Sequence, residues 1–128
     1  MLKRHNPASI HAPASPYTHG VEVPPNARLL FVSGQVGMKP DGSTPADLVA
    51  QNEQAWANLK AVLAAAQMGV GDIVRLNAYV VGADGIAAFR EVRNRMVGEI
   101  KPASTLVVVA ALASPAWKVE IECVAARA

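Results

Sequence analysis

The chain has 128 residues, enough for one hydrophobic core and too few for two, so we expect a single domain spanning residues 1–128. Its formal net charge of +2 lacks the large excess of Lys and Arg that dedicated nucleic-acid binders carry. Hydrophobic residues make up 52% of the chain and charged residues 17%, so we expect some apolar surface to lie in an interface.

The first part of the chain carries no targeting signal that we can identify. Residues 1–16 contain Pro7, Pro13 and Pro16 and no continuous apolar run, so we expect an irregular segment there and not a signal peptide. The chain has no run of about 20 apolar residues, which a membrane helix requires, and its single Cys123 cannot form a disulfide within the chain. These features predict a cytoplasmic protein without a membrane partner.

One strand is predicted on each side of the proline-rich turn Val23–Asn26. The second of these, Arg28–Val36, has the stronger pattern. Ser33 and Gly34 lie near the end of this strand. A hydrolase nucleophile elbow requires a glycine two positions before the serine, and this chain has none there. We therefore predict a strand end with a backbone kink at this point and no nucleophilic serine.

The first helix is predicted to begin at Thr44 and to run to about Met68. Thr44 can cap the helix, Pro45 suits the first helical position, and Asp47 stands where a capping-box acid belongs. Gly69 is the expected stop. Apolar side chains on one stripe are expected to be buried, namely Val49, Trp56, Leu59, Leu63 and Ala66, while Gln51, Gln54, Asn58 and Lys60 lie off it.

The second half of the chain repeats a strand and a helix and then ends in two strands. A strand is predicted at Ile73–Val81, followed by a shorter helix that Asp84 caps. The last two strands, Thr105–Leu112 and Trp117–Ala126, are predicted to form a hairpin. The apolar residues that the second helix is expected to turn inward are Ile86, Phe89, Val92 and Met96.

Two helices can cover only one face of the sheet that these strands form, so the fold class is α+β. In the last strand Val119 and Ile121 are expected to face the helices, and Glu120 and Glu122 to face away. The strand Leu106–Leu112 is apolar on both sides, so both of its faces need cover. We therefore expect the second face of the sheet to pack against another copy of the chain.

Glu120 is the best candidate for a catalytic residue, because an interface on its face would desolvate a carboxylate beside a cleft. The plainer alternative is a salt bridge on the strand surface. Cys123 lies among apolar residues with no evident base, so we expect a buried structural thiol. No metal site is expected, since the three histidines, His5, His11 and His19, have no Cys or carboxylate partner at ligand spacing.

A basic run on the second helix, Arg90, Arg93 and Arg95, could contact RNA, but no aromatic residues interleave to stack bases. We expect a solvated helix face there and no nucleic-acid partner. The glycines of Gly69–Gly71 precede a strand, whereas a phosphate-binding glycine loop follows one, so nucleotide binding is not predicted either.

Several dispersed segments resemble the Rid family, also called the YjgF family of reactive intermediate deaminases. The segments are Ser15–Tyr17, Phe31–Val36, Val70–Val74, Pro102–Thr105 and Lys118–Glu122. The resemblance implies a chorismate-mutase-like α+β fold, with a mixed sheet and two helices on one face. It also implies a homotrimer with a small-molecule cleft at each subunit boundary. Active members hydrolyse 2-imino or enamine acids to 2-keto acids and ammonia and need no cofactor.

The resemblance assigns roles to particular residues of this chain. Tyr17 and Ser33, with the backbone at Gly34, correspond to residues that shape the pocket, and Glu120 to a glutamate that positions or activates water. Ser104 stands where the deaminases have an arginine that binds the substrate carboxylate. This exchange should weaken carboxylate binding by roughly 1.5–3 kcal/mol, so we expect weak or altered hydrolysis of imines.

Two other interpretations remain open at this point. Arg90, at a helix position that is often asparagine in the family, could reach the cleft and replace the missing guanidinium. Alternatively, the chain could be a non-enzymatic metabolite-binding, regulatory or chaperone-like protein, with an RNA-acting protein as a weaker possibility.

Overall fold

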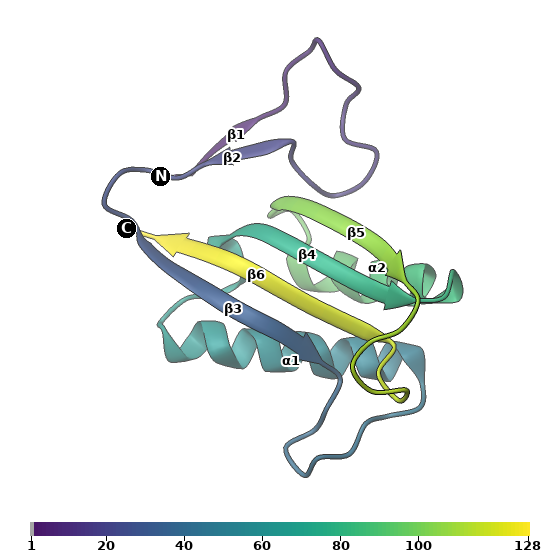
Figure 1. Cartoon of the computed structure of the whole chain (residues 1–128). Helices are drawn as coiled ribbons and strands as arrows, with labels where there is room; N and C mark the ends of the chain where they lie inside the picture. Colours follow the sequence, from purple (N-terminus) through teal and green to yellow (C-terminus); the bar gives the residue numbers. More distant parts are fainter. Residues whose placement is uncertain (1) are drawn as a thin grey trace.

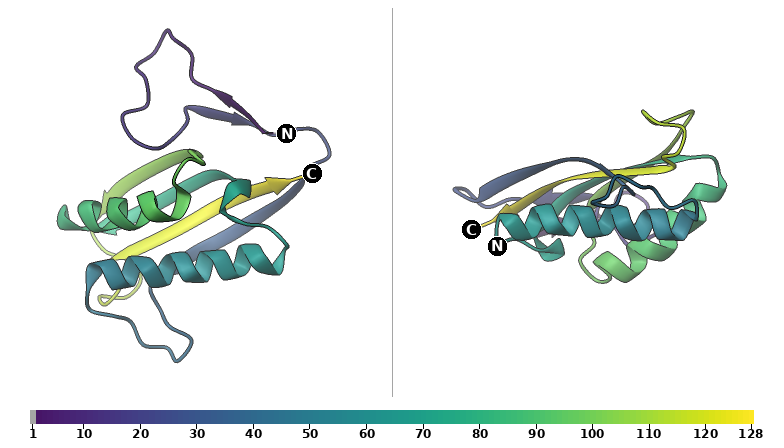
Figure 2. Two further views of the ribbon diagram at one scale, coloured as in Figure 1. Left: turned by 180° about the vertical axis from the view of Figure 1, so that it is seen from behind. Right: turned by 90° about the horizontal axis from the view of Figure 1, so that it is seen from below.

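The structure is a computed structural model that describes residues 2–128. Four strands form a mixed sheet in the order β3-β6-β4-β5, and both helices pack on one of its faces (Figures 1 and 2). The elements follow in chain order as β1 (Lys3–His5), β2 (Gly20–Glu22), β3 (Arg28–Val36), α1 (Leu48–Ala65), the 3₁₀ turn η1 (Val70–Asp72), β4 (Ile73–Val81), α2 (Asp84–Val97), β5 (Ala103–Val109) and β6 (Val119–Arg127). The predicted α+β class is confirmed, and from β2 onward the strands and helices follow in the predicted order.

The predicted hairpin between the last two strands is wrong. β6 lies between β3 and β4 and runs antiparallel to both, whereas β5 runs parallel to β4 at the edge of the sheet. The predicted turn is real, because Trp117 N–H donates to Ser114 O at 3.1 Å, but it lies within a longer loop. That loop, residues 110–118, carries the chain past β4, so that β6 lies inside the sheet and not beside β5.

The first helix begins at Leu48, three residues later than the predicted first helical position Pro45, and ends at Ala65. Asp47 is itself the cap, and its carboxylate accepts from Ala50 N–H at 2.9 Å. Asp and Thr are both good caps, so local sequence could not decide between Asp47 and Thr44. The carbonyl of Pro45 decides it, because this group accepts a hydrogen bond from the Gln51 side chain and is held outside the helix.

The second helix begins at Asp84. We had predicted that Asp84 caps this helix, but it is the first helical residue. The cap position is Ala83, which makes no side-chain capping bond. Gly82 precedes it with a φ of +80°, a conformation that favours glycine and turns the chain sharply from β4 into the helix. Of the four side chains that we expected to face inward, Phe89 and Val92 are fully buried, and Ile86 and Met96 pack partly buried against the core.

The core lies between the helices and the sheet. Trp56, Leu59 and Leu63 of α1 and Phe89 of α2 are fully buried there. Gln51 is also buried, although the sequence suggested a position off the buried stripe. Its amide donates to the carbonyls of Pro45 and Ala116 at 2.9 and 2.8 Å and accepts from Lys118 N–H at 3.0 Å. This side chain therefore holds two loops against α1.

Residues 1–16 are not wholly irregular, because β1 pairs antiparallel with β2. This two-stranded arm stands apart from the main sheet (Figure 1). It is held to the body where Thr18 N–H donates to Pro102 O at 3.1 Å and Arg4 Nε donates to Ile100 O at 3.0 Å. Within residues 2–128, no helix combines the length and the apolarity that crossing a membrane requires.

Candidate functional site

The kink predicted in the first long strand is a bulge beside Glu120. β3 continues through it to Val36, but the register with β6 shifts between Val32 and Gln35, so that β3 contains one extra residue there. A Cβ atom at Gly34 would lie 2.7 Å from Cδ and 3.0 Å from Cγ of Glu120. Only glycine leaves room for this carboxylate, which therefore lies directly against the backbone of the bulge.

Glu120 belongs to a polar group on the face of the sheet that the helices leave uncovered. On β4, Tyr79 stands opposite Glu120, and Asn77 Nδ2 donates to Glu122 Oε2 at 3.2 Å. Burial, and then the negative charges of Glu122 and Glu120, raise the pKa of the Tyr79 hydroxyl. Tyr79 therefore stays protonated beside the two carboxylates and can donate a hydrogen bond on this face.

Tyr17 and Ser104 lie at the other side of the molecule. The hydrogen bond from Thr18 N–H to Pro102 O places each of them within two residues of the same contact. The Tyr17 ring packs edge to face on His19, with 5.5 Å between the ring centroids. Ser104 is paired with the buried Leu76 of β4, so its side chain projects on the helix-covered side of β5.

A single chain therefore keeps Ser104 and Glu120 apart. Ser104 aligns with Leu76 and Glu120 with Tyr79, so the two are separated by two strand spacings and three residues along the strands. Each offset is about 10 Å, and the side chains project on opposite faces of the sheet. The candidate residues of one copy therefore fall into two groups, which we call candidate half-sites: Ser33, Gly34 and Glu120 in one, Tyr17 and Ser104 in the other.

The sequence suggested that the three arginines of α2 form one solvated face, but they do not. Arg90 is exposed, but Arg93 is buried, with 4% of its surface accessible. Arg95 forms ion pairs with Glu53 of α1 at 3.1 Å and with Glu91 at 3.7 Å. At about 100° per residue, Arg95 lies on nearly the opposite flank of α2 from Arg93, so the three side chains do not share one face.

Comparisons with known proteins agree with this architecture. The family model described as endoribonuclease L-PSP matches residues 8–127. A crystal structure of YyfB from Yersinia pestis, a protein of the Rid family, superposes with a TM-score of 0.84 at 34% identity and covers 97% of each chain. The chain is a member of the YjgF/Rid family.

Two further relatives carry names that bear on function. The 2-iminobutanoate/2-iminopropanoate deaminase of Escherichia coli K12 is 35% identical over 126 residues, which cover 94% of this chain and 95% of that protein. The crystal structure of Escherichia coli TdcF with bound serine superposes with a TM-score of 0.73 at 30% identity, covering 98% of this chain and 99% of that one.

The other candidate residues of this Rid protein have local roles. The Cys123 thiol is buried, as predicted, and burial raises its pKa to about 12. His5 lies 3.0 Å from the carboxylate of Glu22, and the rings of His11 and His19 contact backbone carbonyls. Among residues 2–128, no three His, Cys, Asp or Glu side chains lie close enough together to hold a metal ion.

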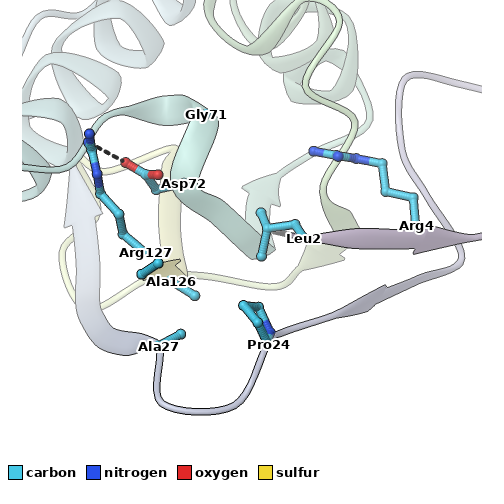
Figure 3. A pocket seen from close by; sticks show the side chains of 9 residues that line it. Leu2, Arg4, Pro24, Ala27, Gly71, Asp72, Ala126 and Arg127 are labelled. Atoms are coloured by element: carbon cyan, nitrogen blue, oxygen red, sulfur yellow. Dashed lines mark ion pairs between the residues drawn. The ribbon is translucent and has the colours of Figure 1, made fainter.

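A hollow in the chain lies away from Glu120, and the sequence did not point to it. It has a volume of about 320 Å³ and lies where the N-terminal arm meets the end of β6, with Arg4, Asp72 and Arg127 on its wall (Figure 3). Arg127 and Asp72 form an ion pair at 3.5 Å across this wall. Arg127 follows Glu120 by seven residues on β6, a distance of about 23 Å, so this hollow contains neither half-site.

Proposed function

We propose that this protein hydrolyses small imines or enamines in a cleft formed between copies of the chain. The name of its Escherichia coli relative, a 2-iminobutanoate/2-iminopropanoate deaminase 35% identical over nearly the whole length, supports a deaminase-like role. In the reaction, the oxygen of a water molecule attacks the C=N carbon. The nitrogen is protonated, the C–N bond breaks, and a carbonyl compound and ammonia leave.

The observation that carries this proposal is the placement of Glu120 against Gly34. The carboxylate is half-buried and rests on the bulge, where the absence of a side chain leaves space next to it. A carboxylate held in this way can accept a proton from water and orient the water oxygen toward an electrophilic carbon. Glu120 is therefore the proposed water-activating group.

We place the proposed cleft between copies of the chain, because one copy separates its two half-sites, and the family resemblance makes a homotrimer the proposed assembly. The uncovered sheet face also carries exposed apolar side chains, with Phe31 73% and Leu29 53% accessible on β3 and Val107 41% accessible on β5. Patches of this kind are typical of association surfaces. In such an assembly the Glu120 half-site of one copy would meet the Ser104 half-site of its neighbour.

Ser104 shapes the expected activity. A neutral hydroxyl at this position replaces the charge-assisted contact that the family resemblance assigns to an arginine there, which corresponds to roughly 1.5–3 kcal/mol of carboxylate binding. We therefore propose slow or altered hydrolysis. The preferred imines would be those whose binding does not require a cation on β5.

The test generates 2-iminobutanoate in the cuvette and follows keto-acid formation above the uncatalysed rate. We expect turnover that Glu120→Gln abolishes, because the amide cannot accept the proton of water. The matched control is Glu122→Gln, which changes a carboxylate two residues away on the same strand face. Equal turnover by wild type and Glu120→Gln would refute the proposed role of Glu120.

A non-enzymatic metabolite-binding protein is the second candidate, and the serine at position 104 is the observation that favours it. Binding of 2-oxobutanoate without any turnover of the imine would identify this alternative. An RNA-acting role has less support, because only Arg90 of the basic run is both exposed and free of an ion pair in residues 2–128.

A further inference from the structure

Arg93 is a buried cation without an anionic partner in the part of the chain that the structure describes. It is 4% exposed, and no carboxylate among residues 2–128 lies within ion-pair distance of it. Its guanidinium carbon lies 5.5 Å from the centroid of the Phe89 ring, and its neighbours include the like charge of Arg90. An unpaired buried charge is costly, so this position calls for an anion that the single chain does not supply.

The guanidinium is held by one neighbour and leaves one edge free. Nε and Nη2 of Arg93 donate to Oδ1 of Asn94 at 3.2 and 3.1 Å. Nη1 donates to no acceptor in residues 2–128. Among these residues, the only fully buried side-chain atoms without a hydrogen-bond partner are Asn52 Oδ1 and Trp56 Nε1, so Nη1 of Arg93 is not fully buried. Nη1 therefore reaches the surface, while the rest of the side chain is covered and fixed.

Arg93 lies on the flank of α2 that faces away from α1. The ion pair between Arg95 and Glu53 marks the opposite flank, which faces α1. At 3.6 residues per turn, Arg93 lies about 160° around the helix from Arg95 and only about 60° from Arg90. α2 lies over β4 and β5 on the helix-covered side of the sheet, so the flank away from α1 is the one nearer the β5 edge (Figures 1 and 2).

Ser104 projects on that same side of β5, and at the same level. α2 packs against β4 and runs back along it, and β5 begins at Ala103, six residues after α2 ends at Val97. The last two turns of α2 therefore lie beside the first residues of β5. The contact that holds Tyr17 to the body, from Thr18 to Pro102, is at this end of β5 as well.

We propose that Arg93 binds the carboxylate of the ligand beside Ser104, supplying from α2 the cation that β5 lacks. One carboxylate oxygen accepts from Nη1 of Arg93, and the other is available to the Ser104 hydroxyl. Asn94 orients the guanidinium, and the charge of Arg90 adds to the attraction for an anion. This inference rests on the proposed function, and it assigns the carboxylate to a residue other than Arg90.

The test compares two ligands that differ only in charge, 2-oxobutanoate and its neutral amide, 2-oxobutanamide, by isothermal titration calorimetry. We expect wild type to prefer the carboxylate by about 10- to 100-fold, as for one charge-assisted contact. Arg93→Met should reduce the preference to within about threefold. Arg95→Met, which removes the same charge from the opposite flank of the same helix, should keep it.

A second measurement is made on wild type and uses a variant only to assign one resonance. The side-chain Nε–H resonance of Arg93, assigned by its loss in Arg93→Lys, should shift when 2-oxobutanoate is added and stay unmoved by the amide. The Arg95 resonance should move with neither ligand. An unchanged ligand preference in Arg93→Met, or an unmoved Arg93 resonance on addition of the carboxylate, overturns the proposal.

Failure of this inference can be separated from failure of the proposed function. If the carboxylate preference depends on Arg93 but the imine is not turned over, the enzymatic proposal fails and the carboxylate site stands. If the imine is turned over and Arg93→Met leaves KM unchanged, the carboxylate site fails alone. If Arg93→Met instead changes the mass of the assembly, measured by light scattering, and keeps the ligand preference, the anion belongs to a second copy, and the proposal is wrong.

Discussion

Substitution of Gly34 by alanine should separate catalysis from stability. The added Cβ atom would lie 2.7 Å from Cδ of Glu120, whereas unstrained carbon atoms approach to about 3.5 Å. The carboxyl group must therefore move by about 1 Å. It can do so at small cost, because it is the end of a flexible side chain and not part of the backbone.

The predicted effect on folding is small. Gly34 does not have a left-handed conformation, so alanine introduces no backbone strain there. Loss of glycine also reduces the entropy of the unfolded chain, by about 0.4–1 kcal/mol in favour of folding. These effects nearly cancel the cost of moving the Glu120 side chain, so we expect the midpoint of thermal unfolding to stay within about 5 °C of wild type.

The predicted effect on turnover is large, because a displacement of about 1 Å from the reactive geometry can cost about 100-fold in rate. The assay is kcat for 2-iminobutanoate hydrolysis beside the melting temperature. Gly69→Ala is the matched control, since a Cβ atom there would meet nothing within 4 Å. Full activity in Gly34→Ala would refute the idea that Glu120 acts from the position that the bulge gives it.

Three further predictions concern stability and reactivity. Gly37→Ala should destabilise the protein by about 1–3 kcal/mol in urea unfolding, because its Cβ atom would lie 2.6–3.0 Å from backbone atoms of Gln51, which cannot move aside. Gln51→Leu should cost a similar 1–3 kcal/mol, measured in the same way, since it leaves two carbonyls and one N–H without the partner that the buried Gln51 amide supplies. Cys123 should resist thiol reagents at pH 8 until the chain unfolds, because its pKa is raised to about 12. Because the unfolded thiol loses its proton near pH 9 and the folded thiol does not, stability should also fall as pH rises above about 9.

The alternation of apolar and polar residues predicted those parts of the fold in which the buried side chains recur at a fixed spacing along one strand or helix. The bounds of β3 and β4 are as predicted, and the alternation in β6 gives Val119 and Ile121 to the core and leaves Glu120 on the other face. Residues two apart in a strand share a face, so this information is present in the sequence. The identity of Glu120 as the candidate residue was therefore predictable.

The ends of the helices were less predictable, because neighbouring residues had similar preferences. Thr44 and Asp47 are both suitable caps, and the structure uses Asp47 because Gln51 binds the carbonyl of Pro45 from inside the core. That bond depends on Gln51 being buried, which its polarity had argued against. Sequence spacing gives no account of a buried amide whose partners come from two distant loops.

The sequence alone determined the class of fold, the family and the face on which Glu120 lies, since periodicity and dispersed motifs are local properties. Tertiary structure alone decided that β6 enters between β3 and β4, that the bulge puts Gly34 under the carboxylate of Glu120, and that Arg93 is buried while Arg90 is not. Each of these depends on contacts between residues far apart in the chain. Their energies come from strand pairing and from what covers each side chain, which no local pattern encodes.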